Sequence, residues 1–301
     1  MRISFAMSQE SRIREINGKQ QEMDRLSTMI ASGKKLLSPS DDPHAWASAM
    51  DLKQGLRSIE TYEKNIQFGL SWGEMTDLQL GRLSDLIGQA KDIAVAAVNN
   101  AVPEEHSAQV EGMEQIVKDG LEVANATLDG RYLFSGLEDP TPDKPFQLDD
   151  ATGLVIYNGD DGSLKLRTGK GVNNESVVNL NGQEVFKPGD ATGDILRELW
   201  SLREAVKAND MDATRAAISS LQGSLEHVRS QRSVLAVRLS DLERRQEALG
   251  AMRLNRQERL SHLEAADTAE MIVRLQQKQT AFEASLRVTA MVDDLNLLDF
   301  L

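Results

Sequence analysis

The chain has 301 residues, with 47 acidic and 34 basic side chains, and its formal net charge is -13. This charge opposes the electrostatic attraction that drives nucleic-acid binding, and the lack of cysteine excludes disulfides and thiol chemistry. Aromatic residues make up only 4% of the chain, so the composition favours long helices with thin apolar seams over one thick core. With no apolar run of signal-peptide or membrane-spanning length, we expect neither a cleaved signal peptide nor membrane insertion.

The first predicted element is a helix over residues from about 8 to 31. Ile16, Met23 and Ile30 follow one another at seven-residue steps, and Ile13 lies one turn before them. This spacing is typical of a helix that pairs with another helix along an apolar seam.

The segment SGKKLLSPSDDP is predicted to be a turn between two helices. Gly33 would end the first helix because glycine readily takes the left-handed conformation of a C-cap. Asp42 would cap the next helix, and Pro43 suits its first position. Gly33 and the lysines after it could instead suggest a phosphate-binding loop. That motif needs an earlier glycine, a Ser or Thr after the lysine and a preceding strand, so we favour the cap.

Two further helices are predicted before the composition changes. One runs from residue 43 to about 98, and the other starts at Pro103 and closes at Gly130. Apolar or small residues recur in the longer helix at seven-residue steps, namely Ala45, Leu52, Ile59, Ile66, Gly73, Leu80, Ile87 and Ala94.

From about 131 to 190 the chain is rich in Pro, Gly, Asn and Asp, with short runs such as LVIY, LKLR and SVVNL. This pattern predicts a small β insert of several antiparallel strands. Asp160-Asp161-Gly162 is predicted to be one hairpin turn, between LVIYN and SLKLR, and Asn181-Gly182 another.

Helices are expected again from about Thr192. A last long helix should continue into the C-terminal segment, with Gly250 as the candidate position for a break. Its heptad series consists of Leu221, Val228, Leu235, Leu242 and Leu249.

The whole pattern predicts a mainly α fold with a small β insert (α+β). Both termini would form long antiparallel coiled-coil helices in an elongated rod, and the β-rich domain would form its tip. The predicted segments are the N-terminal coiled coil and turn, the first half of the rod, the β insert, the returning half of the rod and the C-terminal coiled coil, at 1–42, 43–130, 131–190, 191–260 and 261–301.

No pattern in the sequence indicates catalysis, a cofactor or a metal site, so we do not expect an enzyme. The four histidines are far apart and lack the spacing of metal ligands. Asn158, Asp160 and Gly162 resemble the start of a calcium loop, but Gly169 stands where the acidic ligand is needed.

Two features indicate that the chain needs neighbours. Gln20 and Ser27 fall in the first seam, so the N-terminal helix buries little apolar area if it is paired only once. The ending LNLLDFL is apolar, and its exposure is costly unless it docks on the N-terminal helix of the same chain or is covered by another molecule.

Three stretches of the chain match motifs of a known family. They are SGKKLLSPSDDPHAWASAM at 32 to 50, DGRYLFSG at 129 to 136 and ADTAEMIVRLQQKQTAFEASLRVTAMVDDLNLLDFL at 266 to 301. Together they resemble the flagellar hook-associated protein 3 family, of the flagellin-like superfamily. The start MRIS, the proline in SPSDDP and the ending LLDFL favour this family over flagellin, which shares the helical termini.

The resemblance implies a structural axial protein of the bacterial flagellum, exported unfolded by the flagellar type III route without a cleaved signal peptide. It would be extracellular, assembled as a ring at the hook-filament junction. The implied partners are further copies of the chain, the first hook-filament junction protein, flagellin, the export apparatus and an export chaperone.

On this interpretation the terminal helices pair in the assembled tube. The residues expected at that assembly interface are Ile13, Ile16, Met23, Ile30, Leu275, Phe282, Leu286, Leu295 and Leu298.

Two alternatives stay open from the sequence. The chain could be a small flagellin that forms the filament itself, or a cytoplasmic coiled-coil scaffold or chaperone unrelated to flagella. The scaffold would predict stable helical pairing in the isolated chain, whereas the junction protein predicts labile termini.

Overall fold

A computed structural model describes residues 2–99, 103–138, 143–171, 174–190 and 193–298. It consists of two compact units, here called the terminal unit, 1–58 with 252–301, and the central unit, 59–251. The helices are α1 (Arg2–Ser32), α2 (Pro43–Asn99), α3 (Pro103–Ala124), α4 (Gly182–Phe186), α5 (Ile195–Lys207), α6 (Met211–Glu264) and α7 (Thr268–Leu298). The strands are β1 (Thr127–Leu128), β2 (Arg131–Tyr132), β3 (Phe146–Leu148), β4 (Val155–Tyr157), β5 (Lys165–Arg167) and β6 (Glu175–Val177). The predicted mainly helical fold with a small antiparallel β insert is confirmed.

The core of the central unit follows the heptad series of α2 and α6. Ile66 and Leu80 of α2 are fully buried, as is Leu235 of α6. Gly73 lies at one of the seam positions, and a Cβ atom there would come within 2.3 Å of a methyl carbon of Leu239. The small residue therefore leaves room for a leucine of the opposite helix, which is how these two helices approach each other.

Further helices and the β insert cover this pair in the central unit. Buried side chains of α2, α3, α5 and α6 form one continuous apolar cluster with Phe134, Phe146 and Phe186. The rings of Phe134 and Phe186 meet edge to face, with centroids 5.3 Å apart. These additional elements bury apolar surface that α2 and α6 alone would leave in water.

The β insert consists of three separate two-stranded antiparallel sheets, β1-β2, β3-β4 and β5-β6. In the first, Asp129 and Gly130 both have positive φ, at 50° and 83°, and so form the tight turn between the strands. Gly130 therefore belongs to a hairpin, and α3 ends earlier than predicted, at Ala124. The next residue, Asn125, binds the end of α3 because its amide donates to the carbonyl of Leu121 at 3.0 Å.

Both hairpin turns predicted within the insert are wrong, because β4 pairs with β3 and β5 pairs with β6. The Asp160 carboxylate instead accepts hydrogen bonds from the backbone N–H groups of Leu137 (2.7 Å) and Gly162 (2.8 Å). Asn181 caps α4, where its side chain accepts from the N–H of Glu184 at 2.8 Å. Aspartate and asparagine favour caps and loops as strongly as hairpin turns, and here those roles prevail.

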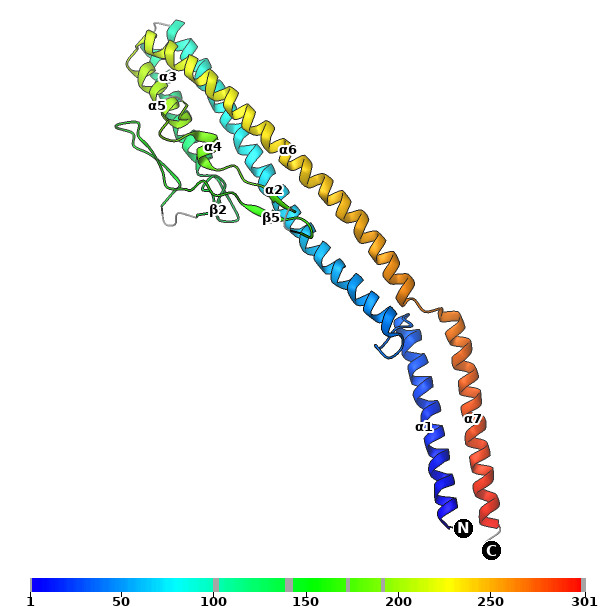
Figure 1. The fold of residues 1–301 in the computed structure, drawn as a ribbon. Coiled ribbons are helices and arrows are strands. Elements are labelled where there is room, and N and C mark those ends of the chain that lie inside the picture. The colour runs from blue at the N-terminus through cyan, green and yellow to red at the C-terminus, as the bar shows by residue number, and fades with distance from the viewer. Residues whose placement is uncertain (1, 100–102, 139–142, 172–173, 191–192, 299–301) are drawn as a thin grey trace. The chain divides into compact units, whose positions relative to one another are not determined.

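In the terminal unit, α1 and α7 lie side by side, with the two chain ends at the same end of the pair (Figure 1). The helix does not break at the candidate position, Gly250, because α6 continues through it to Glu264. The chain leaves the helix only at Ala265, and Asp267 then caps α7 by accepting from the N–H groups of Ala269 and Glu270, both at 3.1 Å.

Candidate functional site

The candidate site is the pair of terminal helices, α1 and α7, together with the turn that joins α1 to α2. Half-buried side chains recur along both helices at alternating steps of three and four residues, which defines the seam between them. On α1 they are Arg12, Ile16, Lys19, Met23, Leu26 and Ile30. On α7 they include Met271, Leu275, Phe282, Ser285 and Thr289.

The predicted interface residues divide into three groups in the structure. Five of them, Ile16, Met23, Ile30, Leu275 and Phe282, are half-buried in this seam. Ile13 and Leu286 stay in solvent, with 57% and 43% of their surface exposed. Leu295 and Leu298 belong to α7, but their side chains lie outside the part of the chain that the structure describes.

Polar residues interrupt the seam where a stable coiled coil would have leucine. The ammonium group of Lys19 donates to the hydroxyl of Ser285 at 2.5 Å and pairs with Glu15 at 2.9 Å. Gln20 and Ser27, which the sequence placed in the seam, are exposed instead. The heptad spacing places Lys19 in the seam, because it lies between Ile16 and Met23. A pattern that counts only apolar residues does not include it.

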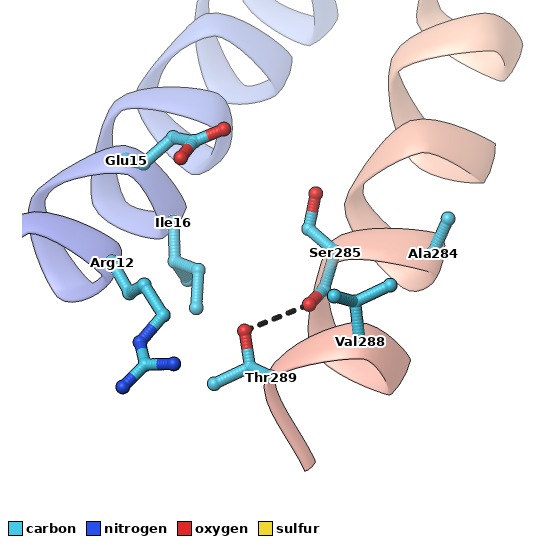
Figure 2. A pocket seen from close by; sticks show the side chains of 7 residues that line it. All are labelled: Arg12, Glu15, Ile16, Ala284, Ser285, Val288 and Thr289. Atoms are coloured by element: carbon cyan, nitrogen blue, oxygen red, sulfur yellow. Dashed lines mark hydrogen bonds between the residues drawn. The ribbon is translucent and has the colours of Figure 1, made fainter. Parts of the chain in front are cut away.

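An open pocket of about 310 Å³ lies between the two helices, near the middle of each. Figure 2 shows Arg12 and Ile16 of α1 on one side and α7 on the other. On the α7 side, Val288 borders the pocket, and the Thr289 hydroxyl donates to the carbonyl oxygen of Ser285 at 2.8 Å. Side chains of the same chain therefore leave this part of the seam incompletely packed.

Large apolar side chains also stand in solvent on the outer sides of α1 and α7. Val288 is 59% exposed, although it borders the pocket. Further exposed side chains, in addition to Ile13 and Leu286, are Met7, Ile272, Val273 and Met291, with exposed fractions between 45% and 67%. Such a set on two adjacent helices is typical of a surface that another protein covers.

The turn between α1 and α2 holds the predicted cap residues. Gly33 has a φ of 65°, in the left-handed region where glycine is favoured. Asp42 accepts hydrogen bonds from two backbone N–H groups of the first turn of α2, each at 3.0 Å, and Pro43 is the first residue of that helix.

Asp41 fixes the loop itself, which the sequence analysis did not foresee. Its carboxylate accepts from the backbone N–H groups of Leu37 (2.8 Å) and Ser38 (3.0 Å). These hydrogen bonds, with the nearby Arg25 guanidinium, hold the pKa of Asp41 below its usual value. The carboxylate thus stays charged, and it serves as the hydrogen-bond acceptor for these two backbone N–H groups of the loop.

No helix in the described part of the chain is long and apolar enough to cross a membrane. Residues 3–139 match the family model of the bacterial flagellin N-terminal helical region. The matched part of the chain is therefore similar to that helical region of flagellins.

Two curated relatives match almost the whole chain. Flagellar hook-associated protein 3 of Salmonella typhimurium is 27% identical over 95% of this chain and 95% of its own length. The Escherichia coli protein of the same name is 26% identical over 99% of this chain and 98% of its own length. They confirm the predicted resemblance to flagellar hook-associated protein 3.

A solved structure and a further curated relative are also similar to the chain. The crystal structure of FlgL from Bacillus cereus is 19% identical, covers 70% of this chain and 98% of that one, and superimposes with a TM-score of 0.58, which shows a common fold. A flagellar filament 30.7 kDa core protein of Treponema maltophilum is 21% identical over 87% of this chain and 85% of its own length.

Proposed function

We propose that this chain is a structural protein of the bacterial flagellum that forms the hook-filament junction, the base on which flagellin polymerises. The observation that carries the proposal is the match along almost the full length to two hook-associated proteins 3. The unfilled seam of α1 and α7 supports it, because an axial protein is expected to finish its packing only in the assembly.

In this function α1 and α7 line the inner tube as a coiled coil, and the β insert forms the tip of a rod that faces outward. The partners are other copies of the chain in a ring, the first junction protein on one side and flagellin on the other. The chain reaches this position outside the cell through the flagellar type III export apparatus, with an export chaperone and without a cleaved signal peptide. It acts as a structural component and not as an enzyme.

The assembly interface consists of the residues of α1 and α7 that the heptads predict. Within one chain, Ile16, Met23 and Phe282 are half-buried in the seam. We infer that neighbouring copies bury them further and cover Ile13 and Leu286, which stand in solvent. Leu275, Ile30, Leu295 and Leu298 complete the proposed interface.

Deletion of the gene tests the function directly. We expect intact hooks in electron micrographs and unpolymerised flagellin in the culture medium by immunoblot. If the flagellin signal itself vanished, the chain would be the filament subunit. Normal motile cells would contradict both and indicate a scaffold unrelated to flagella.

A matched pair of variants on α7 tests the interface. Phe282→Asp places a charge in the half-buried seam, so we expect export without junction assembly and flagellin lost to the medium. Gln277→Asp introduces the same charge at an exposed position of the same helix and should leave filaments normal. Filaments of normal length with Phe282→Asp would refute the interface.

A small flagellin is the second candidate, and one observation favours it: the match to a flagellar filament core protein. That match is weaker and shorter than the two matches to hook-associated protein 3. The deletion experiment separates the two, because only loss of a filament subunit removes the flagellin signal.

A further inference from the structure

The terminal unit has two turns between helices, and these two turns lie next to each other. The turn after α1 passes beside the turn between α6 and α7, and Lys34 and Ala265 form an antiparallel bridge there. The N–H of Lys35 donates to the carbonyl of Glu264 at 2.7 Å, and the N–H of Ala266 donates to the carbonyl of Gly33 at 3.0 Å. Each turn therefore satisfies backbone groups of the other.

A buried carboxylate with two lysine partners lies at the same place. Glu264 is only 7% exposed, and its carboxylate pairs with Lys34 at 3.0 Å and with Lys53 of α2 at 2.5 Å. Burial raises the pKa of Glu264, but hydrogen bonds from Lys53 and Lys34 outweigh it and hold that pKa below the usual value. The ammonium group of Lys53 also lies 5.9 Å from the ring centre of Trp46.

Glu264 is an unfavourable residue for its position unless it has a special role. It is the last residue of α6, and a negative charge at a helix C-terminus is repelled by the partial negative charge of the free carbonyl groups. Its burial adds a desolvation cost. Two lysines from two other segments offset both terms, so three parts of the chain depend on this one carboxylate.

The most buried side chains of the terminal unit belong to the segments near these turns in the sequence. Among the residues of that unit whose side chains the structure describes, the buried ones are Met29, Leu36, Ala49, Leu52 and Glu264. All of the others in α1 and α7 are half-buried or exposed, so the seam between α1 and α7 does little to fix how these helices align.

We propose that Glu264, Lys34 and Lys53 form a clasp that sets the register of α1 against α7. The clasp joins the segment after α1 to the segment before α7. The end of α1 is therefore held beside the start of α7. The partly polar seam then only has to follow that alignment. Glu264 is a positioning residue in this arrangement, and the proposal does not depend on the function of the assembled protein.

Hydrogen exchange of the full-length chain tests the clasp through two amides that cross between the turns. In the wild-type chain, the N–H groups of Lys35 and Ala266 should exchange slowly and at similar rates. Glu264→Gln should speed both by on the order of tenfold or more, because the charge-assisted bonds that hold the turns together are lost. Lys53→Gln should speed the same two amides by a smaller factor.

Glu22→Gln is the matched control, because Glu22 also pairs with a lysine, Lys278, at 2.5 Å but stands in solvent on α1. It should leave the exchange of Lys35 and Ala266 unchanged. The clasp is overturned if these two amides exchange as fast as in an unstructured peptide in the wild-type chain. It is equally overturned if Glu264→Gln changes neither rate, or changes only one of them.

Discussion

The two helix pairs of this chain share one heptad pattern and differ in what they bury. In the central unit, Ile66 of α2 and Leu235 of α6 are fully buried. In the terminal unit, Ile16 and Phe282 are only half-buried, and Lys19 stands between apolar residues of the seam. The central pair is covered by α3, α5 and the β insert, whereas α1 and α7 have no such cover among the described residues. A heptad pattern thus specifies that two helices pair, whereas the burial of their side chains depends on further elements that cover the pair.

The strongest test of this difference in burial replaces one isoleucine by alanine in each of the two helix pairs. Ile66→Ala should lower the free energy of unfolding by about 2 to 4 kcal/mol, because it opens a cavity in a fully buried site. Ile16→Ala should lower it by less than about 1 kcal/mol, because the side chain is already partly in water. Urea unfolding followed by circular dichroism measures both. Equal losses would mean that the terminal seam is as well packed as the central one.

A smaller effect concerns a half-buried polar side chain of the central unit, Tyr157. Its hydroxyl lies 2.9 Å from the carbonyl oxygen of Phe134 and 3.0 Å from that of Asp160. Burial, with smaller contributions from the Asp160 and Asp161 carboxylates, raises the pKa of Tyr157 to about 12. Tyr157→Phe should cost about 1 kcal/mol at neutral pH, since the hydrogen bonds from the hydroxyl to these carbonyls are lost.

The raised pKa of Tyr157 also predicts an alkaline transition. A pKa that is higher in the folded state than the value of 10.0 for a free tyrosine stabilises the fold fully below pH 10. That contribution is lost as the pH rises from 10 through about 12. Phenolate absorbance should show one tyrosine that titrates near pH 12 and disappears in Tyr157→Phe. Ionisation of that tyrosine at or below pH 10 would show that its site is open to water.

Much of the helical framework could be predicted from the sequence, because apolar residues at seven-residue steps leave few other structures. The seam residues Ile16, Met23 and Phe282 follow from the same pattern. The break near Gly250 could not be judged in this way. A glycine inside a long helix costs only about 1 kcal/mol, which packing elsewhere along the helix can offset.

Some loop and polar contacts could not be predicted because they depend on partners distant in the chain. Asp160 binds backbone groups of Leu137 and Glu138, more than twenty residues before it. Glu264 binds lysines that lie more than two hundred residues earlier. A local pattern such as Asp-Asp-Gly at 160–162 records only the freedom to turn, and here the distant partners of Asp160 decide the structure of the loop.

The smallest expected effect is that of the ion pair between Asp77 of α2 and Arg232 of α6. Both carboxylate oxygens accept from the guanidinium, at 2.8 and 2.9 Å, yet the two side chains are 42% and 39% exposed. A double-mutant cycle with Asp77→Ala and Arg232→Ala should therefore give a coupling of at most about 1 kcal/mol in urea unfolding. Raising the salt concentration should weaken that coupling. A coupling well above that of exposed ion pairs would mean that charge, and not apolar burial, is what separates the central pair from the terminal one.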